Sequence, residues 1–238
     1  MNKVIYGDCL EVMKSMKNES VDLIVSDPPY LINYCTNYRK DKNHDFCTSI
    51  QNDNNPELIK NYLKECKRIM KNNTAIYIFC NSEKIEFFKT EMEKLFKIKN
   101  IIVWVKNNWT AGDLKAAFGK QYEFIILANK GRKEFNGKRV TDVWEFDRVH
   151  WSKLTHQNEK PVKLLERCVK KHSNEGETVF DGFAGSFSLS EACDNLKRNW
   201  ICIEKEEKYC KIGLERINKN RVNLNSRLTN DFNLPLLK

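Results

Sequence analysis

The chain of 238 residues lacks the features that mark membrane and secreted proteins. No apolar run approaches the roughly 20 residues that a membrane-spanning helix needs, so no membrane partner is expected. A charged-then-apolar leader is also missing, because Val4-Ile5-Tyr6 already has the character of a strand. We therefore expect a cytoplasmic protein, and the length suits one α/β domain over residues 1–238.

The nine cysteines lack the spacing of a metal site or a disulfide framework. Their number is odd, and no C-x-x-C pair of the kind that binds zinc is present. Several occupy apolar positions of expected helices and strands, where reduced thiols pack as small hydrophobic groups. No metal site is predicted.

Positive charge exceeds negative charge along the chain. Lysine and arginine number 41 against 32 acidic residues, which gives a net charge of +9. A basic balance suits a polyanionic partner such as a nucleic acid. The abundance of Lys, Asn and Ile is also what a biased coding sequence produces, so charge alone assigns no partner.

Apolar strands alternate with amphipathic helices, which is the pattern of a mostly parallel sheet covered on both faces. This pattern predicts a Rossmann-like, doubly wound α/β fold. About seven strands are expected, at residues 4–6, 22–26, 75–79, 101–105, 123–128, 178–180 and 200–203. Helices are expected at residues 9–17, 57–71, 83–96, 161–172, 188–197 and 206–219. Because no helix separates 101–105 from 123–128, these two strands predict an antiparallel extension at one end of the sheet.

The motif Asp27-Pro28-Pro29-Tyr30 follows an apolar strand and supplies the predicted catalytic residues. Its prolines fix the turn, so that the Asp27 carboxylate and the Pro28 carbonyl point the same way. Two such acceptors suit the exocyclic amine of a nucleobase, whose lone pair must be localised before it attacks a methyl group. The Tyr30 ring suits a base that has left its stack. A turn that only caps a buried strand is the alternative.

Four acids fall at or just beyond the carboxyl ends of expected strands: Asp8, Asp27, Asp181 and Glu204. Doubly wound folds bind ligands at this edge of the sheet, so we expect the four acids to line one crevice. Asp8 is also placed to cap the helix that follows it.

A glycine-rich loop runs from Gly182 to Phe187, between an expected strand and an expected helix. Glycines let the backbone approach a ligand at a helix N-terminus, and Glu204 lies 19 residues beyond Gly185 at the end of the next strand. This spacing suits an acid that binds both hydroxyls of a ribose. A glycine turn with a structural role only is the alternative.

Together these residues resemble the S-adenosylmethionine-dependent amino-methyltransferases of DNA, in the permuted class whose catalytic motif precedes its cofactor motif. Order and spacing agree over nearly the whole chain. The resemblance implies methyl transfer to the N6 amine of a flipped adenine in duplex DNA, because aspartate at the first motif position is typical of the adenine enzymes. N4 of cytosine is the alternative within the class. A binding module without activity, and a methylase of RNA or of a protein amide, are the alternatives outside it.

The resemblance also assigns residues to the cofactor. Tyr6-Gly7-Asp8-Cys9 resembles the segment that holds the cofactor adenine, and residues 156–161 resemble the segment that contacts its methionine end. The predicted cofactor-binding residues are Asp8, Cys9, Lys160, Pro161, Asp181, Phe183, Ala184, Gly185, Ser186, Glu204 and Lys205. Two positions of the glycine loop depart from the family pattern, because Gly182 replaces a proline and Phe187 replaces a glycine, and Gln157-Asn158-Glu159 departs from the usual Pro-Thr-Gln before Lys160. A left-handed backbone at Phe187 would be strained, unless Phe187 instead opens the helix normally.

Two long polar stretches are the candidate DNA contacts. Residues 31–55 follow the Asp27–Tyr30 motif and form a candidate loop over the substrate, while residues 131–158 form a candidate inserted segment for target recognition. The predicted nucleic-acid-binding residues are Tyr34, Arg39, Lys40, Arg132, Lys133, Lys138, Arg139 and Arg148. A solvated loop is the alternative for any one of them. The resemblance leaves two further partners open, a second copy of the chain and a companion restriction endonuclease.

Overall fold

A computed structural model describes residues 2–32, 53–109, 114–150, 152, 154–156 and 158–227, and for residues 223–227 the backbone alone. Within this part of the chain, eight strands form one sheet: β1 (Lys3–Tyr6), β2 (Val21–Ser26), β3 (Met70–Cys80), β4 (Lys97–Val105), β5 (Tyr122–Lys130), β6 (Val143–Glu145), β7 (Thr178–Asp181) and β8 (Asn199–Glu204). The helices are α1 (Cys9–Ser15), α2 (Pro56–Ile69), α3 (Ile85–Glu93), α4 (Val162–His172), α5 (Ser188–Asn195) and α6 (Glu207–Arg227).

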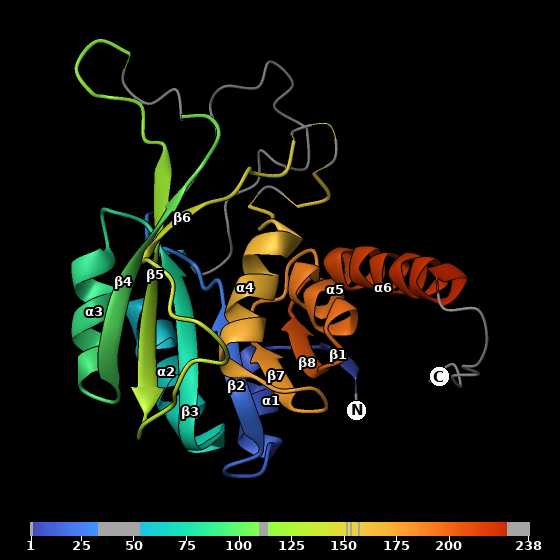
Figure 1. Cartoon of the computed structure of the whole chain (residues 1–238). Coiled ribbons are helices and arrows are strands. Elements are labelled where there is room, and N and C mark those ends of the chain that lie inside the picture. The colour runs from blue at the N-terminus through green and yellow to red at the C-terminus, as the bar shows by residue number, and fades with distance from the viewer. Residues whose placement is uncertain are drawn as a thin grey trace.

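The sheet has the strand order β1-β8-β7-β2-β3-β5-β4-β6. β5 is antiparallel to its neighbours β3 and β4, whereas every other neighbouring pair is parallel. The carboxyl ends of β1, β2, β7 and β8 therefore lie at one edge, which is the upper edge in Figure 1. The hairpin between β4 and β5 projects beyond the same edge.

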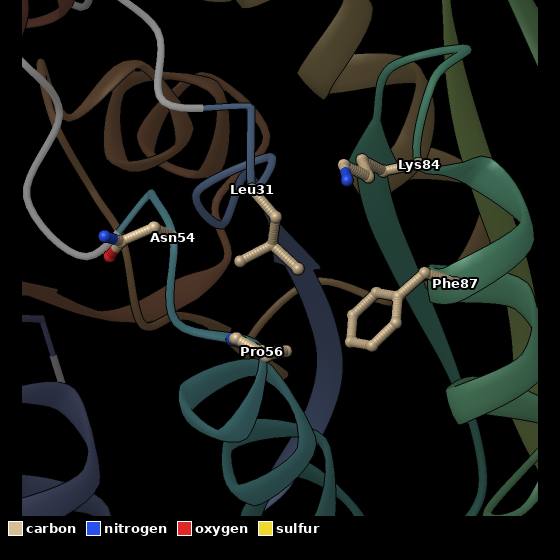
Figure 2. A pocket seen from close by; sticks show the side chains of 5 residues that line it. All are labelled: Leu31, Asn54, Pro56, Lys84 and Phe87. Atoms are coloured by element: carbon tan, nitrogen blue, oxygen red, sulfur yellow. The ribbon is translucent and has the colours of Figure 1, made fainter.

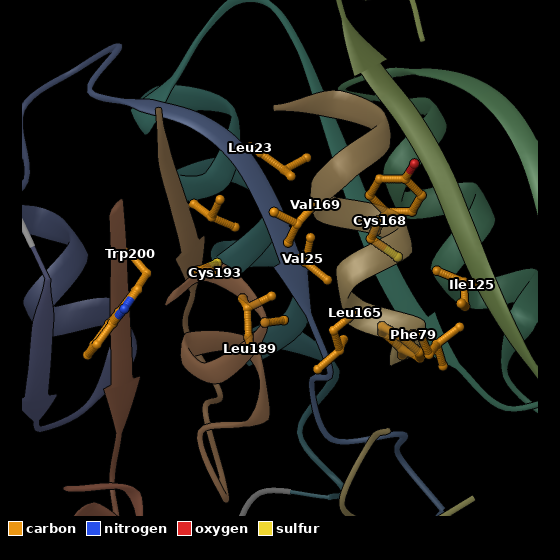
Figure 3. Packing of buried hydrophobic residues seen from close by; sticks show 14 of the residues in the cluster. Leu23, Val25, Phe79, Ile125, Leu165, Cys168, Val169, Leu189, Cys193 and Trp200 are labelled. Carbon is orange, nitrogen blue, oxygen red and sulfur yellow. The ribbon is translucent and has the colours of Figure 1, made fainter. Parts of the chain in front are cut away.

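Helices cover both faces of the sheet, as the apolar pattern predicts. Leu23 and Val25 of β2 belong to the apolar cluster under α4 and α5, whereas Ile24 belongs to the cluster under α1, α2 and α3. Figure 3 shows Leu165 and Val169 of α4 lying against β2 and the neighbouring strands. Successive residues of a strand point to opposite faces, so a continuous apolar run is what a strand buried on both sides requires.

Helix boundaries follow from capping side chains. Asp8 accepts a hydrogen bond from the backbone N–H of Leu10 at the start of α1, and Asn55 accepts one from Leu58 at the start of α2. Pro56 opens α2 at a position where no N–H is needed. The expected cap at Asp8 is therefore present.

The predicted fold class is confirmed, with three corrections to its elements. The sheet has an eighth strand, β6, inside the stretch 131–158 that the polar sequence presented as a loop. The expected helix 57–71 ends at Ile69, because Met70 is already extended and pairs with Val21. The last helix continues past residue 219 to Arg227.

The expected packing of the thiols is confirmed for the cysteines in the described ranges. These are all free and buried: Cys9, Cys66, Cys80, Cys168, Cys193, Cys202 and Cys210. In the same ranges, no helix combines the length and the apolar character that crossing a membrane requires.

Candidate active site

The Asp27–Tyr30 turn and the glycine loop (residues 182–187) meet at the centre of the sheet. β2 and β7 are parallel neighbours, with Ile24 opposite Phe180, so the chain leaves both strands at the same edge. From β2 the chain continues to β3 on one side, and from β7 it continues to β8 on the other. Such a reversal of direction is where doubly wound folds bind their ligands.

Two donors hold the Asp27 carboxylate. The Tyr30 hydroxyl donates to Asp27 Oδ1 at 2.6 Å, and the Lys160 ammonium donates to Oδ2 at 2.5 Å. Lys160 is buried, and its Nζ lies 5.3 Å from the ring centroid of Phe79 and 5.5 Å from that of Tyr30. A buried ammonium is costly without an anion, so Asp27 is its natural partner.

Glu123 on β5 brings a second carboxylate to the same place. Its Oε1 accepts a hydrogen bond from Lys106 Nζ at 2.5 Å. Its Oε2 lies 3.1 Å from the Tyr30 hydroxyl and 3.5 Å from Lys160 Nζ. We call Asp27, Lys106, Glu123 and Lys160 the carboxylate–lysine cluster, in which two negative and two positive charges balance.

The surroundings move the two acids in opposite directions. Burial raises the pKa of Asp27, and Lys160 only partly offsets this. Burial also acts to raise the pKa of Glu123, but Lys160 and Lys106 outweigh it and bring this pKa down to about 2. Burial and the neighbouring Asp27 keep the pKa of the Tyr30 hydroxyl well above its ordinary value, so Tyr30 remains a donor.

A chain of hydroxyl groups joins the Asp27–Tyr30 turn to the glycine loop. Tyr62 of α2 donates to the Ser26 hydroxyl at 2.8 Å, and Ser26 donates to Asp181 Oδ1 at 2.6 Å. Tyr62 also accepts from the backbone N–H of Gly182 at 3.3 Å. Burial raises the pKa of Asp181 to about 7. Asp181 thus lies beneath the glycine loop with its Oδ1 already bonded.

Gly182 is the residue that this contact requires. A Cβ at position 182 would lie 2.5 Å from the Tyr62 ring, too close for any side chain. The departure from the family proline at Gly182 therefore has a local cause, which is the close approach of Tyr62.

Glu204 connects the end of β8 to the glycine loop. Its Oε2 accepts from the Gly185 N–H and its Oε1 from the Glu206 N–H, both at 2.8 Å. Each carboxylate oxygen keeps a second lone pair, so Glu204 can still accept two further hydrogen bonds. Burial raises the pKa of Glu204 despite these N–H donors.

Asp8 and Lys205 flank the same edge. Lys205 Nζ lies 3.2 Å from Asp8 Oδ2, and the other Asp8 oxygen caps α1. Cys9 begins α1 and is buried, and burial raises its pKa to about 12, so the thiol stays protonated. The four acids expected at one edge are thus brought together at the ends of β1, β2, β7 and β8.

Phe187 has the strained backbone that its position predicts. Its φ of 60° and ψ of 29° lie in the left-handed region, and its ring is fully buried. The ring fills a space over α6, where a Cβ on Gly213 would come within 2.1 Å of it. Phe187 replaces a family glycine, and Gly213 leaves the room that its ring needs.

The remaining predicted cofactor residues lie in or beside the glycine loop. Phe183 packs edge-on against Tyr62 with ring centroids 4.7 Å apart, and the Ala184 N–H donates to the Ile203 carbonyl. The buried Ser186 shares a hydrogen bond with Ser188. Pro161 is the N-cap of α4.

His156 also lies against the glycine loop. Its ring is 3.5 Å from where a Cβ on Gly185 would be, and its ring centroid lies 4.4 Å from that of Tyr209. Burial and Lys160 lower the pKa of His156 to about 4, so the ring is neutral at pH 7.

A pocket of about 270 Å³ lies beside the turn, and none of the four acids lines it. It is lined by Leu31, Asn54, Pro56, Lys84 and Phe87 (Figure 2). None of the predicted catalytic or cofactor-binding residues lines it.

The structure divides the basic segment 131–158 between two edges of the sheet. Lys130 at the end of β5 pairs with Thr74, six residues before the end of β3, whereas Phe124 pairs with Cys80 at that end. At about 3.3 Å per residue, these six steps put the edges roughly 20 Å apart. The antiparallel direction of β5 thus takes the chain away from Asp27.

Four predicted DNA contacts lie at this far edge: Arg132, Lys133, Lys138 and Arg139. The Arg132 N–H donates to Asn73, and the Lys138 carbonyl accepts from Lys171 at the end of α4. β6 then returns the chain alongside β4, and the Arg148 N–H contacts the side chain of Asn107 beyond the end of β4. Of the predicted contacts that the structure describes, Arg148 therefore shares the edge with Asp27, and the role of all of them in binding DNA stays a prediction.

The other predicted contacts, Tyr34, Arg39 and Lys40, lie outside the described residues, as does most of the stretch 31–55. At the edge that holds Asp27, the β4–β5 hairpin exposes large apolar side chains instead. Phe118 is fully exposed and Trp109 is 68% exposed. Sequence periodicity did not single out these two residues.

Sequence reasoning also missed the residues that hold the predicted ones. Glu123, Lys106, Tyr62 and Ser26 each contact a predicted site residue through the fold. A usable signal existed for Glu123, because it is the one acid in the apolar run from Tyr122 to Ala128.

The groups at this edge fit an adenosine-bearing sulfonium cofactor. Glu204 retains acceptor capacity for ribose hydroxyls, and a left-handed φ of 50° at Gly185 brings loop backbone close to the crevice. Acidic side chains at the ends of four strands suit a ligand with positive charge. The chemistry of the donor set and the space at Gly185 are both compatible with such a group.

Comparison with known proteins agrees with this geometry. Residues 21–215 match the family described as DNA methylase, of the N6/N4 type. The chain is 30% identical to the DNA adenine methyltransferase YhdJ of Escherichia coli K12, over 90% of this chain and 82% of that protein. It is 27% identical to the Type II methyltransferase M.HpaI of Haemophilus parainfluenzae, over 99% of this chain and 82% of that protein. The crystal structure of the M1.HpyAVI–SAM complex matches with a TM-score of 0.69 and 26% identity, over 92% of this chain and 100% of that one.

Proposed function

The chain belongs to the DNA methylase family, and on that premise we propose that it transfers a methyl group from S-adenosylmethionine to the N6 amine of an adenine flipped out of duplex DNA. The observation that carries this proposal is the placement of Asp27 directly beside the glycine loop, at the ends of neighbouring strands. Acceptors for an amine and a site for a charged cofactor thereby share one edge.

Three elements would hold the cofactor. Glu204 would accept hydrogen bonds from the ribose hydroxyls, Asp8 and Cys9 would border the adenine, and the glycine loop with His156 would border the rest. Bound S-adenosylmethionine supplies a methyl group on a positively charged sulfur. Every other contribution comes from side chains and backbone groups of the chain itself.

Asp27 and the Pro28 carbonyl would receive the substrate amine. Each accepts one amine hydrogen, which localises the nitrogen lone pair and offsets the positive charge that develops on nitrogen. The fixed turn puts these acceptors in place before the reaction, so no ordering cost arises during it. The raised pKa of Asp27 makes it a better proton acceptor once the amine is methylated.

Tyr30 would stack on the flipped base. Base–aromatic stacking is worth roughly 1–3 kcal/mol, which offsets part of the cost of unstacking the base from the duplex. Its hydroxyl donates to Asp27 at 2.6 Å, which holds the ring beside the acid before a substrate enters.

DNA would lie across the edge where Asp27 and the β4–β5 hairpin are found. Arg148 would contact the phosphate backbone or a base edge there, and the exposed Trp109 and Phe118 would contact the opened duplex. Tyr34, Arg39 and Lys40 are proposed contacts from the stretch that follows the turn. Arg132, Lys133, Lys138 and Arg139 are not proposed as contacts to the same stretch of duplex.

Two further partners are proposed on the family resemblance alone, a second copy of the chain and a companion restriction endonuclease. A cytoplasmic location is proposed because the proposed substrate is DNA. Sedimentation of the purified protein at several concentrations tests the first of these partners.

A panel of substrates tests the proposed function. Purified protein is incubated with S-adenosylmethionine carrying a labelled methyl group and with duplex DNA, RNA or an unrelated protein. Label is expected in duplex DNA. Label in RNA or protein alone would replace the proposed substrate, and cofactor binding without transfer to any of the three would replace the enzyme by a binding module.

A further inference from the structure

The carboxylate–lysine cluster contains an arrangement that the reaction described above does not use. Both donors of Asp27 also face one oxygen of Glu123. Tyr30 lies 2.6 Å from Asp27 Oδ1 and 3.1 Å from Glu123 Oε2, and Lys160 lies 2.5 Å from Asp27 Oδ2 and 3.5 Å from the same Glu123 Oε2. Glu123 Oε2 is thus only 0.5 Å farther than Asp27 from the Tyr30 hydroxyl, and only 1.0 Å farther from Lys160 Nζ.

The other oxygen of Glu123 is fixed. Lys106 Nζ binds Glu123 Oε1 at 2.5 Å, and it also lies 5.0 Å from the ring centroid of Trp104. Glu123 and Lys106 come from β5 and from the residue after β4, two strands joined along their whole length. Lys106 therefore holds Glu123 in place from the side away from Asp27, and Oε2 is left facing the Asp27 donors.

The donors of Asp27 compete with a substrate amine. Each Asp27 oxygen keeps a second lone pair, but Tyr30 and Lys160 already draw on its negative charge, so an amine there would meet a weakened acceptor. Lys160 is 7% exposed and has aromatic rings around its ammonium, so it cannot simply withdraw into water. If the Lys160 ammonium moved away from Asp27 with no other anion to bind, its buried charge would be unpaired.

We propose that Glu123 is a positioning residue, which receives Lys160 and Tyr30 from Asp27 when the substrate amine enters and returns them when it leaves. This inference rests on the proposed function, because it needs an amine at Asp27. The Asp27 carboxylate then no longer accepts hydrogen bonds from Tyr30 and Lys160 and can accept them from the substrate amine. The net charge of the cluster stays constant. The buried charges are never left unpaired.

The protonation states of the surrounding groups suit this exchange. Lys160 and Lys106 bring the pKa of Glu123 to about 2 against the effect of burial, so Glu123 is an anion at pH 7. The groups facing Asp27 are Tyr30, Lys160, Glu123, Cys80 and Asp181. Burial raises the pKa of Cys80 to about 12, so this thiol stays neutral.

Two substitutions should move the pH dependence in opposite directions. Glu123→Gln removes the alternative anion, so Lys160 stays on Asp27 and lowers the pKa of Asp27. The acid limb, which is the fall of the methylation rate at low pH as Asp27 is protonated, then moves to lower pH. Lys106→Met leaves Glu123 with Lys160 as its only lysine, which draws Lys160 away from Asp27, and the acid limb moves to higher pH. A residue that only stabilises the fold would give no such pair of opposite shifts.

The experiment measures single-turnover methylation of duplex DNA against pH, with wild type, Glu123→Gln, Lys106→Met and the control Glu93→Gln. Glu93 forms an exposed ion pair with Lys89 at 2.6 Å within α3, outside the cluster, so its removal should leave the rate and the limb unchanged. Glu123→Gln should slow methyl transfer about 100-fold, as expected when reacting groups are misplaced. Its affinity for S-adenosylhomocysteine should stay within twofold of wild type.

The outcomes separate the two proposals. If wild type itself methylates no DNA, the proposed function fails. If wild type is active and Glu123→Gln methylates DNA within threefold of it with the same acid limb, Glu123 does not receive the donors. Calorimetric binding of S-adenosylhomocysteine shows whether each variant is folded. If Glu123→Gln fails to fold, Lys106→Met still decides the test. A shift of the acid limb of Lys106→Met to lower pH, or no shift, would overturn the proposal.

Discussion

The Asp27–Tyr30 turn and the glycine loop are neighbours, yet they are held in different ways. Charge holds the turn, since Lys160 and Glu123 with its own lysine surround the Asp27 carboxylate. Packing and neutral donors hold the glycine loop, through the Phe187 ring over Gly213 and the Tyr62–Ser26–Asp181 hydroxyl chain. The turn should therefore respond to changes of charge, and the loop to changes of volume.

The difference matches what each region has to do. An acceptor that must bind and release an amine benefits from charged partners that can be exchanged, because hydrogen bonds between charged groups adjust without a change of shape. A loop that must fit one cofactor benefits from close packing, because packed side chains resist displacement. Substitutions can separate these two behaviours.

The largest effect is expected at Asp27. Asp27→Ala removes the acceptor for the amine, so methyl transfer should fall at least 10³-fold, within the range for loss of a proton-accepting group. Binding of S-adenosylhomocysteine, measured by calorimetry, should stay nearly intact. Glu204→Ala is the matched counterpart and should weaken that binding about 10- to 100-fold, as loss of hydrogen bonds to a charged group does. Normal cofactor binding by Glu204→Ala would show that the ribose assignment is wrong.

A volume change at Gly213 should act on the glycine loop and not on the turn. Gly213→Ala puts a methyl group into the Phe187 ring, so the free energy of unfolding should fall by about 1–3 kcal/mol, the usual cost of overpacking. Phe187→Ala in the same chain removes the clash, so the two losses should not add. Denaturant titration of the two single variants and the double variant measures this coupling. Additive losses would mean that ring and helix do not meet.

The sequence predicted the residues of both regions better than the forces that hold them. Asp27, Asp181, Gly185 and Glu204 were identified because strand ends of a parallel sheet share an edge, and that follows from local pattern. Glu123 was not identified, because its contact with Asp27 depends on β5 running antiparallel beside β3.

The same antiparallel strand separates residues of the basic segment that are close together in the sequence. Residues 131–139 were expected to act with Arg148. They follow β5, which ends at the edge opposite Asp27, whereas Arg148 follows the three-residue strand β6, which pairs with the end of β4. The alternation around Val143-Trp144-Glu145, with Trp144 buried between two exposed residues, is the signal for β6 that a polar composition concealed.

A smaller effect is expected from Asp181→Asn, and it depends on pH. Burial raises the pKa of Asp181 from its ordinary value of 3.8 to about 7. Between these values the folded chain binds a proton that the unfolded chain has released, so Asp181 lowers stability progressively as pH rises from about 4 to about 7, and the loss stays constant above that. Asn keeps an oxygen for Ser26 and removes the charge.

Thermal unfolding at several pH values measures this difference. Asp181→Asn should equal wild type below about pH 4 and exceed it in melting temperature at pH 8, with the gap opening between. A variant less stable than wild type at pH 8 would mean that the Asp181 charge is favourable in the folded chain.

The smallest effect is expected at the protein surface, where the basic segment can be tested edge against edge. Arg148→Ala should weaken binding to duplex DNA severalfold, about 1 kcal/mol for one lost phosphate or base contact, whereas Arg132→Ala at the far edge should change it little. Fluorescence anisotropy at two salt concentrations measures both. Equal losses for the two variants would mean that the DNA path does not follow the edge that holds Asp27.

The most direct test of methyl transfer by the Asp27–Tyr30 turn is the identity of the product. Wild type and Asp27→Ala are each incubated with mixed-sequence duplex DNA and S-adenosylmethionine, and the DNA is digested to nucleosides for mass spectrometry. N6-methyladenine from wild type and no methylated base from Asp27→Ala is the predicted result. N4-methylcytosine from wild type would keep the mechanism and change the substrate. Equal methylation by both proteins, or none by wild type, would contradict methyl transfer by the Asp27–Tyr30 turn.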